Sequence, residues 1–489
     1  AAATPALVIL AEQEEFHPLL EDIPPEVAAE IAAHPAEFPG VRVVELARRE
    51  YPAGTLAAHV IGQLGPATAA ESLDAVSGMR DPERLVGRTG SECSAEANLS
   101  GRPGIDVDRI DHRGHSLGIE HRRMPQAGSD VVLSLDPVLQ RAAEALLDGA
   151  CRPSGGGAEG GAVVIMDVET GELYVSASAP RFDPRLLVAG DQARLTTLFN
   201  AANHPLVDRA AKMAIPPGSV FKLLTAVAML EENVTTDAEP FFCQGFLETP
   251  ESLRCQIFRQ QGIGHGDATL ERALACSCNV YFFHHATALG VDRLTAWAER
   301  CGFGRPTGVE LPDEAAGEVP HAAAAATDPE RVAMARSLAI GQGTLRCTPL
   351  QIVRFVAVLA NGGRLLQPTL KLHGGPVSAT AEAINIQSGA LAAIRRGMCA
   401  AVADTEGTAY ASARLANVAI AGKTGTAQTS GKDHAWFAGF APADAPRVAF
   451  VVVLEHGGPA EGAARIAREM IASMQRLGRL HPPPGLAGD

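Results

Sequence analysis

The pattern of apolar and polar positions divides the chain into two regions. Residues 1 to about 125 alternate in short runs that predict strands and turns, and no long amphipathic helix dominates. After that point, apolar residues recur at helical spacing, and Asp136-Pro137 supplies an N-cap followed by a proline at the first helical position. We place a short strand at 131–135 directly before this helix. The sequence thus predicts an N-terminal domain over 1–125, a larger domain over 126–480 and a disordered tail at 481–489.

Strand patterns stand at both ends of the larger region. The run "AVVIMDV" is followed by Thr170-Gly171 and then "ELYVSAS", which predicts a hairpin. Near the end, "HAWFAGFAP" and "RVAFVVVLEH" predict a second strand pair, followed by a helix over 462–476. Because helices fill the stretch between these pairs, we expect an α+β domain whose first and last strands join in one antiparallel sheet.

Length and charge exclude several classes of protein. A chain of 489 residues suggests more than one domain, and a net charge of −15 without a basic tract argues against nucleic-acid binding. No apolar run is long enough to span a membrane. The chain begins at Ala1 inside a predicted strand, "ALVILAE". We therefore expect the native N-terminus, with any membrane anchor, to lie outside this sequence.

The nine cysteines do not form a recognisable metal or redox motif. They include no C-x-x-C pair, which argues against a zinc ribbon or a thioredoxin-type site. A disulfide between Cys243 and Cys255 across a loop is a possible pairing. The neighbouring His284 and His285 belong to no H-E-x-x-H set, and we interpret them as part of a helix face. We expect no metal and no cofactor.

Two short motifs resemble known sites but fail on their context. Gly422-Lys423-Thr424 would end a P-loop only with a glycine five residues earlier, where the chain has Asn417. The segment therefore predicts a strand that ends in Lys-Thr-Gly-Thr. Ser116 lies in "GHSLG", but a nucleophile elbow needs an apolar strand before it and a helix after it, and both flanks are charged. We interpret it as a surface turn.

Ser219 is the stronger candidate nucleophile. It begins the apolar helical segment in "PPGSVFKLLTAVAML", where a serine is most often an N-cap. Lys222 follows one helical turn later on a helix that should be buried. Desolvation lowers the pKa of a buried lysine, so its free amine could accept the serine proton.

Two later motifs raise the specificity of this assignment. Ser277-Cys278-Asn279 lies within "ACSCNVYFF", and Lys423-Thr424-Gly425 follows further on. The order S-x-x-K, S-x-N and K-T-G is the three-motif set of penicillin-recognising serine enzymes.

The chain resembles the class B penicillin-binding proteins, which are D,D-transpeptidases of peptidoglycan synthesis. The resemblance is strong over about 126–480, through "PPGSVFKLLTA", "GHGDATLERALACSCNVYFF", "AIGQGTLRCTPLQIVRFVAVLANGG", "GKTGTAQ" and "HAWFAGFAP". It is looser over 1–125, where "YPAGTLAAHVIGQLG" and "VGRTGSE" are similar to the family's N-terminal pedestal. The segments "GHG" and "GKTGTAQ" favour the elongation-type branch. The resemblance implies a transpeptidase fold, with helices on both sides of an antiparallel sheet, after a β-rich pedestal.

The resemblance also assigns roles. Ser219 would attack the carbonyl between two terminal D-alanines, with Lys222 as general base. Ser277 would relay a proton, Asn279 would orient Lys222, and Lys423 would bind the substrate carboxylate.

The remaining assignments concern the third motif. The hydroxyls of Thr424 and Thr426 would assist Lys423, and Gly425 would leave room for the substrate. The backbone N–H groups of Ser219 and Thr426 would form the oxyanion hole. Trp436 and Phe437 could either line the cleft or belong to the core.

The implied partners are peptidoglycan stem peptides, β-lactam antibiotics, a membrane glycosyltransferase and cell-wall scaffold proteins. The implied location is the extracytoplasmic (periplasmic) face of a bacterial membrane. Two alternatives stay open: a β-lactamase or D,D-carboxypeptidase that transfers the acyl group to water, and a non-catalytic sensor or scaffold. The chain lacks the E-x-x-L-N segment of class A β-lactamases, which predicts slow drug hydrolysis.

Overall fold

A computed structural model of the chain describes residues 19–480, apart from 21, 42, 45–48, 73–83, 113–115, 153, 155–156, 189–191 and 373–380. Its internal contacts divide the chain into two compact units, Ala1–Pro52 and Ala53–Asp489. The predicted strand "ALVILAE" and the predicted tail at 481–489 lie outside the described residues. The predicted domain boundary near residue 125 stays a prediction.

The first unit contains helix α1 (Pro25–Ala33). A proline stands at its start, where the missing N–H costs no hydrogen bond, and none of its residues is buried.

The N-terminal part of the second unit combines short strands and helices. β1 (Leu64–Pro66) pairs with β2 (Leu85–Gly87), and β3 (Ile105–Ile110) forms an antiparallel ribbon with β4 (Ser116–Arg123). The short helix α2 (Ala58–Ile61) precedes β1, and α3 (Gly90–Ser94) and α4 (Glu96–Leu99) lie between β2 and β3 in the chain. Ser116 is therefore the first residue of a ribbon strand, and the rejection of a nucleophile elbow is confirmed.

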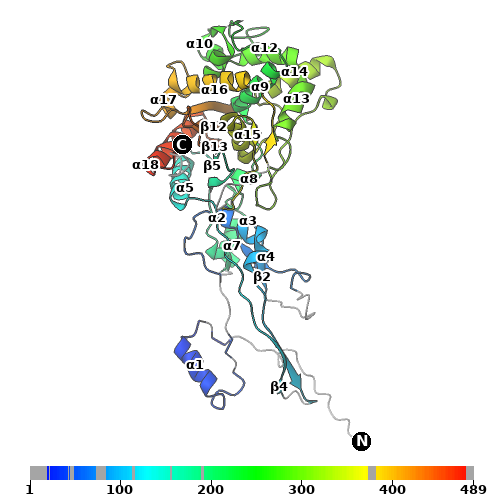
Figure 1. The fold of residues 1–489 in the computed structure, drawn as a ribbon, viewed down its shortest axis with the longest axis vertical. Helices are drawn as coiled ribbons and strands as arrows, with labels where there is room; N and C mark the ends of the chain where they lie inside the picture. Colours follow the sequence, from blue (N-terminus) through cyan, green and yellow to red (C-terminus); the bar gives the residue numbers. More distant parts are fainter. Residues whose placement is uncertain are drawn as a thin grey trace, which may run out of the picture. The chain divides into compact units, whose positions relative to one another are not determined.

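A five-stranded antiparallel sheet forms the centre of the second unit (Figure 1). Its order is β11 (Ala421–Ala427), β12 (His434–Ala441), β13 (Val448–Glu455), β5 (Gly160–Asp167) and β6 (Leu173–Ala179). β13 pairs with β5 along its whole length. This pairing confirms that strands from the two ends of the region join in one sheet.

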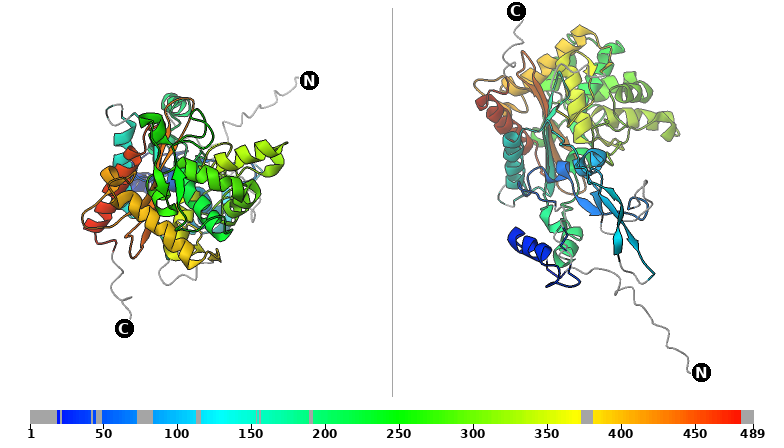
Figure 2. Two further views of the ribbon diagram at one scale, coloured as in Figure 1. Left: turned by 90° about the horizontal axis from the view of Figure 1, so that it is seen from above. Right: turned by 60° about the horizontal axis from the view of Figure 1, so that its bottom comes forward.

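Helices cover both faces of this sheet. Successive residues of a strand point to opposite faces, and β5 accordingly divides its side chains between two buried apolar clusters. Val163 and Ile165 pack with α5 (Pro137–Cys151) and α18 (Glu461–Arg476), whereas Val164 and Met166 pack in the cluster that includes α15 (Pro349–Asn361). Figures 1 and 2 show these helices on the two sides of the strands.

The start of α5 follows from its sequence, but the strand predicted before it is wrong. Asp136 caps the helix by accepting hydrogen bonds from the N–H groups of Val138 and Leu139. In contrast, 131–135 forms only one isolated bridge, between Leu133 and Lys371. The alternating pattern indicated an extended backbone. Among the described residues, however, no strand continues the pairing beyond this bridge.

The remaining elements are mostly helical. They are α6 (Arg185–Val188), α7 (Gln192–Phe199), α8 (Arg209–Lys212), the 3₁₀ turn η3 (Gly218–Phe221), α9 (Lys222–Glu231), β7 (Phe241–Cys243), α10 (Gln256–Gln261), β8 (Gly266–Ala268), α11 (Leu270–Ala275), α12 (Asn279–Leu289), α13 (Val291–Arg300), η4 (Ala322–Ala324), α14 (Asp328–Ala339), β9 (Arg364–Leu365), β10 (Glu382–Ala383), α16 (Ser388–Ala403) and α17 (Tyr410–Ala413). Among the described residues, no helix combines the length and the apolar character that a membrane crossing needs.

Candidate active site

Ser219 lies in the 3₁₀ turn η3, which leads directly into the buried helix α9. The N-cap residues of η3 and α9 are Pro217 and Phe221, so the simple N-cap interpretation of Ser219 is wrong. The residue is only partly buried, whereas its neighbours Gly218 and Val220 are buried. The turn thus presents one hydroxyl at the edge of an apolar core.

Lys222 begins α9 and is completely buried. Its Nζ donates to the carbonyl oxygen of Ser277 (2.8 Å), to Ser277 Oγ (3.2 Å) and to Asn279 Oδ1 (2.7 Å). Burial lowers the pKa of this amine to about 8, because the low-dielectric interior disfavours the ammonium form. The first and second predicted motifs are therefore in direct contact.

The second motif occupies the turn between α11 and α12. Ser277 has a φ of 55°, in the left-handed region that non-glycine residues rarely adopt. Asn279 is the first residue of α12, and its Nδ2 donates to the carbonyl oxygen of Arg254 at 3.1 Å. Asn279 therefore links the Lys222 amine to the loop that contains Arg254.

The third motif lies on β11, the edge strand of the sheet. Lys423 is completely buried and donates to the carbonyl oxygen of Thr424 at 3.1 Å. Burial first, and then the nearby charge of Lys222, lower the pKa of its amine well below the ordinary value. The hydroxyl oxygens of Thr424 and Thr408 lie 2.7 Å apart.

Close backbone packing brings the third motif beside the nucleophile. A Cβ on Gly218 would lie 2.6 Å from the carbonyl oxygen of Thr426, and one on Gly425 would lie 2.7 Å from that of Pro217. Gly425 thus has a packing reason to be glycine that sequence reasoning missed. Thr426, which is exposed, and Ser219, which is partly buried, stand on these two adjoining segments.

Gly341 supports the nucleophile turn from a further segment. Its carbonyl oxygen accepts from Gly218 N–H at 3.0 Å, and a Cβ at Gly341 would meet the Gly218 carbonyl oxygen at 2.1 Å. We expect Gly341→Ala to displace the turn and slow acylation of Ser219 by at least about tenfold, because small misplacements of reacting groups are costly. The acylation rate with a fluorescent penicillin measures this loss.

Gly343→Ala is the matched control for Gly341→Ala. Both glycines have positive φ, +71° and +81°, so both substitutions impose similar backbone strain. A Cβ at Gly343 would meet only the Ser337 side chain, at an ordinary 3.5 Å. Equal acylation rates in the two variants would show that the contact with Gly218 does not position the nucleophile.

Other residues that the sequence raised lie outside the catalytic cluster. Trp436 and Phe437 are fully buried in the sheet. They therefore belong to the core and do not line the cleft. His284 and His285 lie on α12, one exposed and the other buried. Cys243 and Cys255 are free thiols with sulfurs 3.7 Å apart, so the possible disulfide does not form in this structure.

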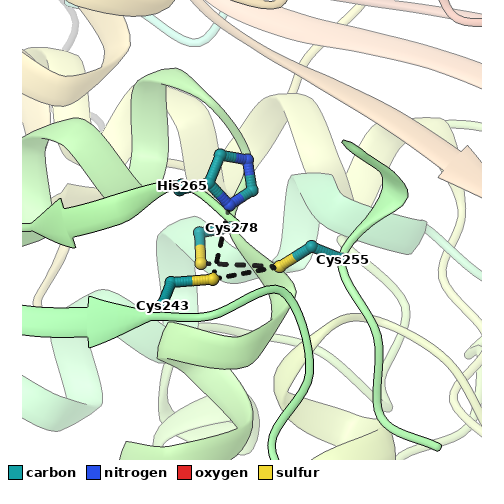
Figure 3. A group of neighbouring side chains, drawn as sticks. All are labelled: Cys243, Cys255, His265 and Cys278. Atoms are coloured by element: carbon teal, nitrogen blue, oxygen red, sulfur yellow. Dashed lines mark hydrogen bonds between the residues drawn. The ribbon is translucent and has the colours of Figure 1, made fainter. Parts of the chain in front are cut away.

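One group of residues was missed by the sequence reasoning. The side chains of Cys243, Cys255, His265 and Cys278 converge on one point, and we call them the thiol–imidazole cluster (Figure 3). The expectation of no metal site rested on the absence of short-range motifs. Cysteines 12 and 23 residues apart give no such motif, although "GHG" beside the second motif was a usable signal.

The fold and the three motifs place the chain among the penicillin-recognising serine enzymes. Residues 161–473 match the family model for the penicillin binding protein transpeptidase domain, and residues 10–133 match the penicillin-binding protein dimerisation domain. The chain belongs to this family.

The similar curated proteins include two peptidoglycan D,D-transpeptidases. The chain is 32% identical over 468 residues to the peptidoglycan D,D-transpeptidase MrdA of Acinetobacter baumannii, covering 88% of this chain and 66% of the relative. It is 30% identical over 492 residues to MrdA of Escherichia coli K12, covering 91% and 74%. This chain thus spans about two thirds to three quarters of the length of these relatives.

Solved structures agree with the fold. The PBP2 in a complex with MreC from Helicobacter pylori is 29% identical, with a TM-score of 0.81 and coverage of 94% of this chain and 84% of that one. PBP2 of Pseudomonas aeruginosa in complex with WCK 5153 is also 29% identical, with a TM-score of 0.76 and coverage of 91% and 94%.

Proposed function

We propose that this chain is a peptidoglycan D,D-transpeptidase that cross-links stem peptides through an acyl-enzyme on Ser219. One observation carries this proposal: the completely buried amine of Lys222 is held by Ser277 and Asn279, one helical turn from the accessible Ser219. A buried lysine with a lowered pKa is suited to act as a general base.

The reaction then proceeds in two acyl transfers. The Lys222 amine takes the Ser219 proton as Oγ attacks the carbonyl between two D-alanines. The C–N bond breaks, the departing D-alanine receives a proton through the Ser277 hydroxyl, and an ester to Ser219 remains. An amine of a second stem peptide then attacks this ester. It forms the cross-linking amide and returns a proton to Ser219 Oγ.

The third motif would bind the donor peptide. Among the described residues, no carboxylate forms an ion pair with Lys423, so an incoming substrate carboxylate would stabilise its ammonium form. The open edge of β11 offers backbone groups that an extended peptide can pair with. The N–H groups of Ser219 and Thr426 would stabilise the oxyanion, and loss of one such donor costs roughly 3 kcal/mol.

We expect the rate of acylation to rise with pH through about 8. The amine of Lys222 acts as a base only when neutral, and its pKa of about 8 means that the neutral fraction grows between about pH 7 and pH 9. The groups that act on it are Lys423, Ser277 and Asn279, and also the thiols of Cys255, Cys276 and Cys278. Stopped-flow acylation over this range, with folding followed by circular dichroism, measures the profile; a flat profile would argue against Lys222 as the base.

The partners follow from the comparisons. One similar structure is a PBP2 bound to MreC, and another is titled as a peptidoglycan synthase complex that coordinates polymerisation and crosslinking. We therefore propose that this chain works with a cell-wall scaffold and a membrane glycosyltransferase, at the periplasmic face of the membrane.

Persistence of a drug adduct distinguishes the transpeptidase from its alternatives. We expect a fluorescent penicillin to label the chain stoichiometrically and to stay attached for many minutes, because the sequence lacks the E-x-x-L-N segment found in class A β-lactamases. Rapid turnover of the drug would indicate a β-lactamase. Stable labelling without any action on peptides ending in D-Ala-D-Ala would indicate a sensor or scaffold.

A further inference from the structure

A short loop between α16 and α17 contacts both the second and the third motif. We call residues 404–409 the α16–α17 loop. The N–H of Thr408 donates to the carbonyl oxygen of Ala275 at 3.1 Å, and the Thr408 hydroxyl oxygen lies 2.7 Å from Thr424 Oγ1. Ala275 is the last residue of α11, two positions before Ser277, and Thr424 belongs to the third motif. Thr408 therefore bridges two catalytic segments that are far apart in the sequence.

The backbone of the α16–α17 loop is held in place by its own contacts. The N–H of Gly407 donates to the carbonyl oxygen of Asp404 at 2.8 Å, and the N–H of Ala409 donates to that of Ala401 at 2.9 Å. A Cβ on Gly407 would lie 2.5 Å from the Ala401 carbonyl oxygen, so the close approach of the loop to the end of α16 requires glycine. The hydroxyl of Thr408 is thus presented from a fixed backbone, although the residue itself is exposed.

The Thr408 hydroxyl lies on the side of β11 that carries the two threonine side chains. Successive residues of a strand point to opposite sides, so Thr424 and Thr426 share one side. Lys423 and Gly425 point to the other side. Thr426 is exposed, whereas Thr424 is only 7% exposed. Thr424 is therefore nearly enclosed, with a second hydroxyl within hydrogen-bonding distance of its own.

The chemistry of hydroxyl groups gives this pair a direction when an anion binds. A threonine hydroxyl has one proton and two lone pairs. If Thr424 gives its proton to a carboxylate, its oxygen can only accept from the neighbouring hydroxyl, which must then be the donor. Thr408 Oγ1 lies close enough to fill that place. Because hydrogen bonds in a chain polarise one another, a bond from Thr408 to Thr424 strengthens the bond from Thr424 to the anion.

We propose that Thr408 is a positioning residue for recognition of the substrate's terminal carboxylate. It acts through Thr424: the Thr408 hydroxyl donates to the Thr424 hydroxyl and directs the proton of that hydroxyl toward the carboxylate. The bond from the Thr408 N–H to Ala275 fixes this arrangement relative to the second motif. The inference rests on the proposed acyl transfer and adds a residue outside the three motifs to the donor site.

A simpler role for Thr408 would be to satisfy the hydroxyl of a nearly buried residue. Buried polar groups are usually hydrogen-bonded, and loss of such a bond costs stability wherever it lies. That role predicts the same change in rate for every compound that acylates the chain. Carboxylate recognition predicts a change that depends on whether the compound carries a carboxylate.

Thr408→Val separates the two roles, because valine has the shape of threonine but lacks the hydroxyl. Second-order acylation constants would be measured by intact-protein mass spectrometry with benzylpenicillin and with its methyl ester, which has no carboxylate. We expect the substitution to slow acylation by benzylpenicillin about three- to tenfold, the range for loss of one hydrogen bond, and to change acylation by the ester less than about twofold.

Two further variants serve as controls. Thr408→Ser keeps the donor and should react with benzylpenicillin within about twofold of the wild-type rate. Thr197→Val removes the hydroxyl of an exposed threonine on α7, where it donates to the Ala193 carbonyl oxygen at 2.9 Å. This variant should be acylated like the wild type by both compounds.

A donor peptide ending in D-Ala-D-Ala gives a second readout. The carboxylate is bound in the ground state as well as in the transition state, so Thr408→Val should raise KM and leave kcat within about twofold of the wild type. A general disturbance of Ser219 or Lys222 would lower kcat instead.

The outcomes distinguish this inference from the proposed function. Equal slowing of benzylpenicillin and its ester, or no slowing of either, would overturn the inference and leave the proposed function standing. Slow acylation by benzylpenicillin in Thr408→Ser as well as in Thr408→Val would also overturn it, since serine retains the donor. A wild-type chain that neither compound acylates would contradict the proposed function and the inference together.

Discussion

Ser219→Ala is expected to abolish covalent labelling by a fluorescent penicillin. The substitution removes the oxygen that would form the acyl bond, while η3 should keep its backbone, because Ser219 is the N-cap residue of neither η3 nor α9. Gel fluorescence after denaturation reports covalent adducts only.

The control for this variant is Ser473→Ala. Ser473 is a partly buried serine on α18 whose hydroxyl donates to the Glu469 carbonyl oxygen at 2.8 Å. It should label like the wild type. Persistent stoichiometric labelling of a folded Ser219→Ala chain would mean that another residue is the nucleophile.

Lys222→Met is expected to slow acylation by about 10²–10⁴-fold, the range that general acid–base catalysis contributes. Methionine has a similar length and carries no charge, so its burial needs no polar partner, and the buried position should tolerate it. The variant leaves Asn279 Oδ1 and the Ser277 carbonyl oxygen without their donor. We expect some loss of stability but a folded chain, with residual slow labelling of Ser219.

Lys212→Met provides the comparison for Lys222→Met. Lys212 is partly exposed, and its Nζ lies 3.5 Å from the exposed carboxylate of Asp313. Surface ion pairs contribute little, so this variant should keep the wild-type acylation rate. Loss of less than about tenfold in Lys222→Met would assign proton transfer to another group.

The sequence predicted the parts of the fold that short-range chemistry determines. Asp136-Pro137 marks the start of α5, and short apolar runs bounded by turn residues mark β5, β6, β12 and β13. The strand at 131–135 failed, because pairing depends on a partner strand that local alternation does not reveal. The α+β class and the sheet that joins both ends were predictable, whereas the exact packing was not.

The candidate site divides in the same way. Ser219, Lys222 and the two later motifs are visible as spaced residue types, and the structure brings them together. The support from Gly341 and the packing reason for Gly425 depend on contacts between distant backbones. The thiol–imidazole cluster likewise joins four segments whose spacing fits no short motif.

The most direct test of the central claim is product analysis by mass spectrometry. The chain would be incubated with a donor peptide ending in D-Ala-D-Ala and an acceptor stem peptide that carries a free amine. The account predicts an amide-linked product that has lost one D-alanine, formed by the wild type and absent with Ser219→Ala. Formation of only the hydrolysed donor, or an amide product that persists in Ser219→Ala, would contradict it.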